Sequence, residues 1–197
     1  MENVNQDYLM EKGKEILYLC YKNDVSFPRS CGVTSAYISF YLFKNEAFRN
    51  KYKINLVRGH FRNTNQEDDC PFFDLESGDF SECANCTCDY FTQHSWVEIK
   101  DNEDMKLTIL DFTISQFSED IGDLEEYLHD NKSLSAEELI ALLKKYGKFI
   151  VENNNQVYFP ETITPALEVY NKISKVIEEE GISELEYWED KSSFAFV

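Results

Sequence analysis

The segment Arg29-Ser30-Cys31-Gly32-Val33-Thr34-Ser35-Ala36-Tyr37 marks the point where an irregular, proline-containing stretch gives way to a helix. Ser30 is predicted to be the N-cap residue. Cys31 then falls in the first turn, where unpaired backbone N–H groups and the helix dipole favour an anion. Free cysteine is also among the most buried residue types, so Cys31 is either an activated nucleophile or a small core residue. Apolar residues follow at intervals of three and four, as one buried helix face requires: Val33, Ala36, Tyr37, Phe40, Tyr41 and Phe43.

Chain length and net charge limit the number of domains and the classes of partner. The chain has 197 residues, of which 43% are hydrophobic and 15% aromatic, and this predicts one domain spanning residues 1–197 with a real core. The formal net charge of −18 repels nucleic acid phosphates and anionic lipids. We therefore expect a protein or peptide partner, favouring a basic one, and neither nucleic acid nor a membrane surface.

The first residues, Met1 to Asp7, lack the positive start and apolar run of a signal peptide, and no apolar stretch is long enough to span a bilayer. These patterns predict a cytoplasmic protein, with export by another route or delivery as an effector left open. In a reducing compartment, six cysteines indicate metal binding or catalysis before disulfides.

Two helices and a strand are expected in the first third of the chain. The first helix covers about residues 6–21, with Gly13 as a weak point and Cys20 as a core residue. The Cys31 helix runs to about Lys44. Residues 54–61 are β-branched and alternating, which predicts a strand.

A hairpin is predicted for residues 94–113, where two β-rich runs flank four polar residues, 101–104. With that loop, Lys100 faces Met105 and His94 faces Asp111. Directly opposite residues of an antiparallel pair have Cβ atoms about 4.5 to 5.5 Å apart, which is close enough for an imidazole–carboxylate hydrogen bond. A slip of one residue would bring an apolar residue opposite His94 instead.

The remainder is expected to be mainly helical. Ser135-Ala136-Glu137-Glu138 is a capping box that opens an amphipathic helix closing at Gly147. A second helix starts at Thr164-Pro165 and has Gly181 past its end. Between the two helices, residues 148–151 and 156–159 are candidates for short strands.

A thiol nucleophile needs a base to accept its proton and a third group to orient that base, and Cys31, His94 and Asp111 supply these types in that order. His60 and His129 are the only other histidines. Taken alone, His94 also fits a solvent-facing histidine at a strand edge. Asp111 lies inside an apolar run, where a carboxylate must be paired to be tolerated, and this favours a site.

These residues resemble the transglutaminase-like branch of the papain-like thiol enzymes. The resemblance lies in the cysteine that opens a helix, in the histidine–x–tryptophan strand 94–99, and in the aspartate–x–threonine segment 109–117, which ends in Gln116-Phe117. It implies an α+β fold in which the nucleophile's helix packs on an antiparallel sheet, with C-terminal helices. It also implies that Cys31 is the nucleophile, His94 the general base and acid, and Asp111 the orienting carboxylate.

Such a site attacks a carboxamide or ester carbonyl, forms a thioester and passes the acyl group to water, an amine or an alcohol. The outcomes are proteolysis, glutamine deamidation or transamidation. The oxyanion is expected to bind the Cys31 backbone N–H and one side chain. Asn23 and Gln116 are the candidates for that side chain, and Trp96 is a further candidate for contact with substrate.

The remaining cysteines, Cys70, Cys83, Cys86 and Cys88, lie close together within the segment 62–92. Four thiolates fill a tetrahedral zinc shell, and a polar segment without its own core gains from such a staple. We expect a structural zinc ion, with free or oxidised thiols as the alternative. If one cysteine does not ligate, His60, Asp74 or Asp89 can replace it. The site would fix this segment next to His94, without chemistry of its own.

Two further functions fit the same residues. One is a zinc-stapled interaction module whose triad is inactive and whose acidic surface docks a basic partner. It would show a His94 ring far from Cys31 or an Asp111 side chain pointing into the core. The other is an acyltransferase that takes the acyl group from a small thioester, although an acidic surface disfavours a phosphate-rich donor.

Overall fold

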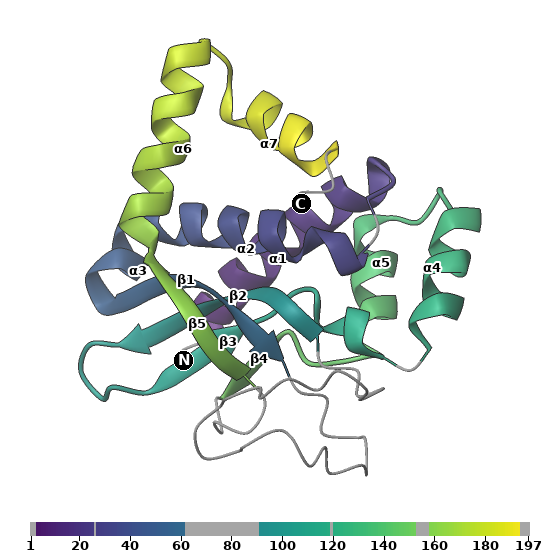
Figure 1. Cartoon of the computed structure of the whole chain (residues 1–197), viewed down its shortest axis with the longest axis horizontal. Coiled ribbons are helices and arrows are strands. Elements are labelled where there is room, and N and C mark those ends of the chain that lie inside the picture. Colours follow the sequence, from purple (N-terminus) through teal and green to yellow (C-terminus); the bar gives the residue numbers. More distant parts are fainter. Residues whose placement is uncertain (1–2, 26, 62–90, 119, 153–157, 194–197) are drawn as a thin grey trace, which may run out of the picture.

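The computed structural model describes residues 3–25, 27–61, 91–118, 120–152 and 158–193. Helices and a single sheet alternate along the described chain (Figure 1). In chain order the elements are α1 (Asn3–Lys22), α2 (Phe27–Lys44), α3 (Glu46–Lys51), β1 (Tyr52–Phe61), β2 (Phe91–Asp101), β3 (Leu107–Leu110), the short 3-10 helix η1 (Ile114–Phe117), α4 (Ile121–Asp130), α5 (Ala136–Leu143), β4 (Ile150–Glu152), β5 (Tyr158–Pro165), α6 (Ala166–Glu180) and α7 (Glu184–Ser193).

The sheet has the strand order β4-β3-β2-β1-β5, and each neighbouring pair is antiparallel. The chain is therefore an α+β protein with an antiparallel sheet, as predicted. Strands β2 and β1 lie inside the sheet, while β4 and β5 form its edges. No helix among the described residues is long and apolar enough to cross a membrane.

The two faces of the sheet have different surroundings. Val97 and Ile99 of β2 belong to the main core with residues of α1, α2 and α6, because alternate residues of a strand point to one face. Helix α2 packs directly on β1 and β2. Trp96 points the other way and forms a small second cluster with Val57, Ile109 and Tyr158. The residues of β2 thus connect the helical core to a separate, smaller apolar layer.

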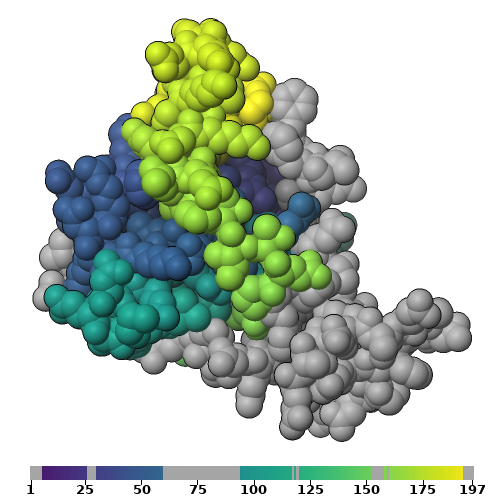
Figure 2. Space-filling view, turned by 60° about the vertical axis from the view of Figure 1, so that its left-hand side comes forward, coloured from purple at the N-terminus to yellow at the C-terminus, as the bar shows by residue number. Residues whose placement is uncertain are grey.

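The C-terminal helices complete the main core. Helix α6 follows β5 directly and ends at Glu180. The next residue, Gly181, caps it with a φ of 65°, the left-handed conformation that glycine adopts readily. The predicted glycine beyond the helix end is therefore confirmed. Trp188 of α7 is buried against Tyr37 and Phe40 of α2. In Figure 2, α6 forms the upper end of the molecule and the β2–β3 hairpin lies below it.

The hairpin register differs from the predicted one. Lys100 pairs with Leu107, and the Asp101 N–H donates to the carbonyl of Lys106, so the turn lies one residue later than predicted. Met105 adopts a φ of 61°, an uncommon conformation for a residue other than glycine, and the sequence gives no sign of it. His94 therefore does not face Asp111 across a regular ladder. Each residue of β2 faces a β3 residue two positions later than predicted, and because a shift of two keeps the alternation, every side chain stays on its predicted face.

Smaller differences concern element ends. The capping box at Ser135 is present, but α5 ends at Leu143, before the predicted Gly147. The predicted strand at 148–151 is β4, starting at Ile150. Thr164 and Pro165 belong to β5, so the last long helix begins at Ala166.

Candidate active site

Cys31 is the fifth residue of α2, not a residue of its first turn, because the helix begins at Phe27 rather than after Ser30. The prediction that Ser30 is the N-cap was wrong. Pro28 lies in the first turn, where proline lacks only an N–H group that the helix leaves unpaired anyway. An α-helix leaves its first four N–H groups unpaired, and the N–H of Cys31 lies beyond them. Its role in binding an oxyanion is therefore less favourable than predicted.

A buried serine joins the helix of Cys31 to the strand of His94. The Ser35 hydroxyl, one turn after Cys31, donates a hydrogen bond of 2.9 Å to the carbonyl oxygen of Ser95. Ser35 and Ser95 are both buried. This bond fixes where α2 crosses β2, and it sets the half-buried Cys31 next to the backbone of Ser95 and the ring of His94.

His94 and Asp111 form a short, buried hydrogen bond. His94 Nε2 lies 2.7 Å from Asp111 Oδ2, and the two residues are only 3% and 1% exposed. The predicted contact is present although the predicted register is not, because Asp111 follows the end of β3 and its side chain reaches His94 from outside the ladder. Asp111 does not point into the apolar core unpaired.

Three further donors hold the Asp111 carboxylate. Oδ1 accepts bonds from the Thr113 backbone N–H at 3.2 Å and from the Thr113 hydroxyl at 3.1 Å. Oδ2 accepts a bond of 3.0 Å from the Tyr158 hydroxyl on β5. A carboxylate with several donors is stabilised in its charged form. The buried Asp111 carboxylate therefore has hydrogen-bond partners on both oxygens.

Gln116 lies on the other side of the imidazole. Its Nε2 is 3.1 Å from His94 Nδ1 and donates a 3.1 Å bond to the Thr113 hydroxyl. Because Nε2 of His94 is bonded to Asp111, Nδ1 is the ring nitrogen that remains for the thiol. The Gln116 amide nitrogen donates to Nδ1 while the ring is neutral; when Nδ1 carries a proton, the amide has to turn so that its oxygen accepts the hydrogen bond. Of the two side chains predicted to contact the oxyanion, Asn23 and Gln116, only Gln116 is brought to His94 by the structure.

The electrostatics of this cluster favour an ion pair. Burial opposes ionisation of Cys31, but the hydrogen bond and charge of His94, with the Ser95 backbone, outweigh it and lower the pKa of the thiol below 9.0. Burial likewise disfavours a charged His94, yet Asp111 and then Cys31 raise the pKa of this imidazole from 6.5 to about 9. Both shifts act in the direction of a thiolate beside an imidazolium.

Two predicted contact residues have other roles. The Asn23 amide donates 2.6 Å to the Ser192 hydroxyl of α7, so it ties the end of α1 to the C-terminal helix and is not available to the oxyanion. Trp96 has no exposed surface and therefore cannot touch a substrate in this structure. Its ring stacks on His94 with centroids 5.9 Å apart, and its Nε1 donates to Glu98. Trp96 therefore packs against the imidazole of His94.

Two glycines make room for the segment that carries Asp111. A Cβ atom on Gly13 of α1 would lie 2.0 Å from the Phe112 ring, and one on Gly147 would lie 2.7 Å from Ile114. Real Cβ contacts are almost never that short, so both positions require glycine or a shift of the neighbour. Gly13 weakens its helix by about 1 kcal/mol relative to alanine. In return, it permits the close approach of the residue next to Asp111.

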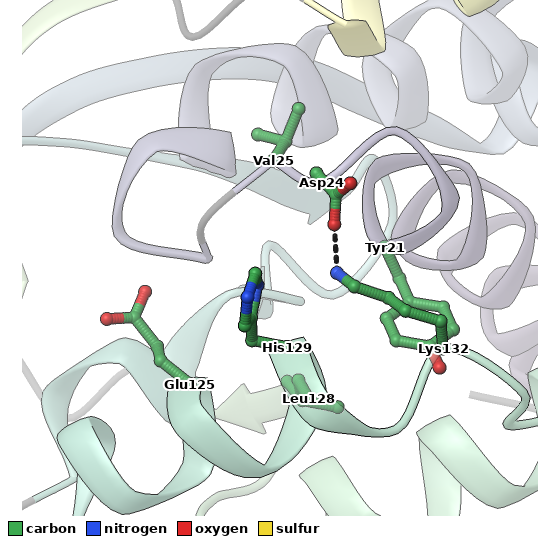
Figure 3. A pocket seen from close by; sticks show the side chains of 7 residues that line it. All are labelled: Tyr21, Asp24, Val25, Glu125, Leu128, His129 and Lys132. Atoms are coloured by element: carbon green, nitrogen blue, oxygen red, sulfur yellow. Dashed lines mark hydrogen bonds and ion pairs between the residues drawn. The ribbon is translucent and has the colours of Figure 1, made fainter.

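A cleft of about 430 Å³ lies between the end of α1 and α4 (Figure 3). His129, one of the two other histidines, lines it beside the ion pair formed by Asp24 and Lys132. None of Cys31, His94 and Asp111 is among its described lining residues: Tyr21, Asp24, Val25, Glu125, Leu128, His129 and Lys132. His129 therefore belongs to a surface cluster, whereas His94 is the histidine beside the Cys31 thiol.

The predicted zinc ligands, Cys70, Cys83, Cys86 and Cys88, lie outside the described residues, as do the substitutes Asp74 and Asp89. Within the described part of the chain, no group of three or more histidine, cysteine, aspartate or glutamate side chains is placed to hold a metal ion. The structure therefore leaves the zinc prediction untested.

Comparison of the chain with protein-family models, with curated proteins and with solved structures finds no match. The case for a function therefore depends on the geometry of the site itself.

Sequence reasoning missed two residues of this site. Ser35 looks like an ordinary small residue of an amphipathic helix, and Tyr158 like a core residue of a short strand. Thr113 lay within the quoted aspartate–x–threonine pattern but had no predicted partner. The one sequence feature that these three residues share is a side-chain hydroxyl. The structure adds that each is at least nine-tenths buried, so each hydroxyl needs a hydrogen-bond partner inside the protein.

Proposed function

We propose that the protein is a thiol-dependent acyl-transfer enzyme that acts on a protein or peptide amide, with Cys31 as nucleophile, His94 as general base and acid, and Asp111 as orienting group. One observation carries the proposal: the imidazole that lowers the pKa of Cys31 is itself bonded to a buried carboxylate at 2.7 Å. This is the nucleophile, base and orienter arrangement of thiol and serine hydrolases. An interaction module with an inactive triad gives no reason for such a pair.

The first half of the reaction forms a thioester. The Cys31 thiolate attacks the carbonyl carbon of the amide, and a C–S bond forms while the carbonyl oxygen becomes an oxyanion. His94 then gives its Nδ1 proton to the leaving nitrogen as the C–N bond breaks, which releases an amine or ammonia. The neutral imidazole that remains has Nε2–H directed at Asp111, so its Nδ1 is ready to accept a proton.

The second half transfers the acyl group. Water or an amine attacks the thioester carbonyl, His94 Nδ1 takes the proton of the attacking group, and the C–S bond breaks to regenerate the thiolate. Water yields proteolysis or deamidation of glutamine, and a lysine amine yields a cross-link. Gln116 is the side chain best placed to donate to the oxyanion, because its amide already lies 3.1 Å from the catalytic ring nitrogen.

The arrangement of elements supports the likeness to papain-like and transglutaminase-like enzymes. A helix with the cysteine packs on an antiparallel sheet, the histidine lies on β2, and the aspartate directly follows β3, in the order cysteine, histidine, aspartate. The net charge of −18 supports a basic protein or peptide as substrate. The proposed zinc site takes no part in the steps above.

The test is mass spectrometry of a lysate treated with the wild type, with Cys31→Ala, or with Cys20→Ala. New chain termini indicate proteolysis, unit mass gains at glutamine indicate deamidation, and cross-linked peptides indicate transamidation. We expect one of these products with the wild type and with Cys20→Ala, which lacks a thiol outside the site, and none with Cys31→Ala. Equal products from Cys31→Ala, or none from a folded wild type, would overturn the proposal and favour an interaction module.

A further inference from the structure

Tyr158 reaches the site from the far edge of the sheet. Its hydroxyl lies 3.0 Å from Asp111 Oδ2, the same oxygen that accepts the His94 Nε2–H at 2.7 Å. Tyr158 opens the edge strand β5, whereas Asp111 follows β3, and the strand order places β1 and β2 between them. The phenol therefore spans two strands to bond a carboxylate that no sequence motif connects with it.

A glycine on β1 and the ring of Trp96 border the path from Tyr158 to Asp111. Gly59 of β1 pairs with His94 on one side and with Pro160, two residues after Tyr158, on the other, so β1 has no side chain between His94 and Pro160. The register of β1 shifts at this glycine against both neighbours. The Tyr158 ring packs on Trp96 with centroids 5.2 Å apart, and Trp96 in turn stacks on His94. Tyr158 is thus held by packing as well as by its hydrogen bond.

The carboxylate is fully occupied. A carboxylate has about four lone-pair sites. Asp111 uses two on the Thr113 N–H and hydroxyl, one on His94 and one on Tyr158. Because Asp111 is 1% exposed, loss of one donor inside this cluster leaves an oxygen with one partner fewer and little access to water.

We propose that Tyr158 is a positioning residue that shares Oδ2 of Asp111 with His94 and thereby sets how strongly His94 holds its proton. The inference rests on the proposed function of the site and adds a fourth member to it. A hydroxyl that donates to Oδ2 competes with the imidazolium for the negative charge of the carboxylate. Tyr158 keeps the His94–Asp111 bond strong enough to orient the ring but weak enough for His94 to release its Nδ1 proton to the leaving group.

Other ionisable groups share this environment and enter the prediction. Among the described residues, Cys31 of α2 bonds to His94, and Glu98 lies on the same face of β2 beyond Trp96. Burial raises the pKa of Glu98. The Tyr158 hydroxyl contacts Asp111 Oδ2, so its replacement acts on the Asp111 side of the imidazole.

The test is an NMR titration of the His94 imidazole, which is practical because the chain has only three histidines. In Tyr158→Phe, which keeps the ring and loses the hydroxyl, we expect the pKa of His94 to rise by about half a unit to one unit. Tyr37→Phe is the matched control, because it removes a 2.7 Å tyrosine–carboxylate bond to Glu15 from the helix of Cys31 without contact to Asp111. The control should leave the His94 titration unchanged.

A second substitution, with the opposite expected effect on the pKa of His94, tests the proposal if Tyr158→Phe unfolds. Site-specific replacement of Tyr158 by difluorotyrosine retains the hydroxyl and makes it a stronger donor, so the pKa of His94 should fall. An unchanged titration in a folded variant, or shifts of the reverse sign, would overturn the proposal. The titration needs no substrate: predicted shifts in a protein without products support the coupling and contradict only the proposed function.

Discussion

The two described thiols outside the predicted zinc cluster, Cys20 and Cys31, lie on neighbouring helices and have opposite character. Cys20 is fully buried in the main core, and burial raises its pKa to about 12. Burial acts on Cys31 as well, yet the pKa of Cys31 is lowered, because a charged imidazole and the Ser95 backbone outweigh desolvation. Burial alone makes a thiol inert, and a nucleophile requires a neighbour that is itself held in its charged form.

The largest effect that separates the two thiols is their rate of alkylation. At pH 7, a thiol of pKa about 12 is a thiolate in only about one molecule in 100,000. Iodoacetamide should therefore label Cys31 at least about a thousandfold faster than Cys20, as measured by peptide mass spectrometry over time. Cys31→Ala should abolish this fast labelling while leaving the melting temperature nearly unchanged. Equal labelling rates for the two residues would contradict the contrast.

Asp111→Asn should move Cys31 toward the behaviour of Cys20. An amide cannot supply the negative charge that raises the pKa of His94, so the imidazolium and with it the thiolate are lost at neutral pH. We expect Cys31 alkylation at pH 7 to slow by about 10 to 100-fold. Asp24→Asn, which breaks the surface ion pair with Lys132, is the control and should leave the rate unchanged.

The pH dependence of stability tests the charge of His94 directly. The pKa of His94 is raised by folding from 6.5 to about 9, so its contribution to stability is complete below pH 6.5 and disappears as the pH rises through about 9. In a Cys31→Ala background, Asp111 still raises the pKa of His94 but Cys31 no longer does, so the rise is smaller. The free energy of unfolding of this variant should fall by about 1 to 2 kcal/mol between pH 7 and 9.5.

A reference variant separates this contribution from that of Cys20. Folding raises the pKa of Cys20 too, so its contribution also decreases as the pH rises through its folded value of about 12. Adding His94→Gln to Cys31→Ala removes only the histidine part. Denaturant titrations of both variants should show the steeper decline when His94 is present, and parallel curves would refute a raised pKa for this residue.

The smallest expected effect concerns the bond between α2 and β2. Ser35→Ala removes the donor to the Ser95 carbonyl and should cost about 1 kcal/mol of stability and slow Cys31 alkylation by up to about tenfold. Ser39→Ala is a matched control: Ser39 lies one turn later on the same helix, is fully buried, and its hydroxyl has no hydrogen-bond partner among the described residues. Equal effects of the two changes on alkylation would remove Ser35 from the site.

The sequence alone predicted Cys31, His94 and Asp111 as a group, because the aspartate conflicts with its local pattern and the histidine has few alternatives. Asp111 interrupts an apolar run, and only three histidines can act as the base. It could not predict Tyr158, since periodicity identifies strands without their order in the sheet, and this contact spans two strands. The hairpin register was missed because Met105 takes a left-handed conformation that its residue type does not suggest.

Gly13 and Gly147 give the site a sensitivity to changes made outside it. They lie against the segment that follows Asp111, and a single methyl group at either position would meet Phe112 or Ile114 well inside normal contact distance. Such a methyl group would displace Phe112 or Ile114. These residues are covalently next to the polar residues Asp111 and Thr113, which would then move with them. The tuning of the thiol thus extends to two positions that contain no side chain at all, and substitutions there would alter its chemistry without removing any of its groups.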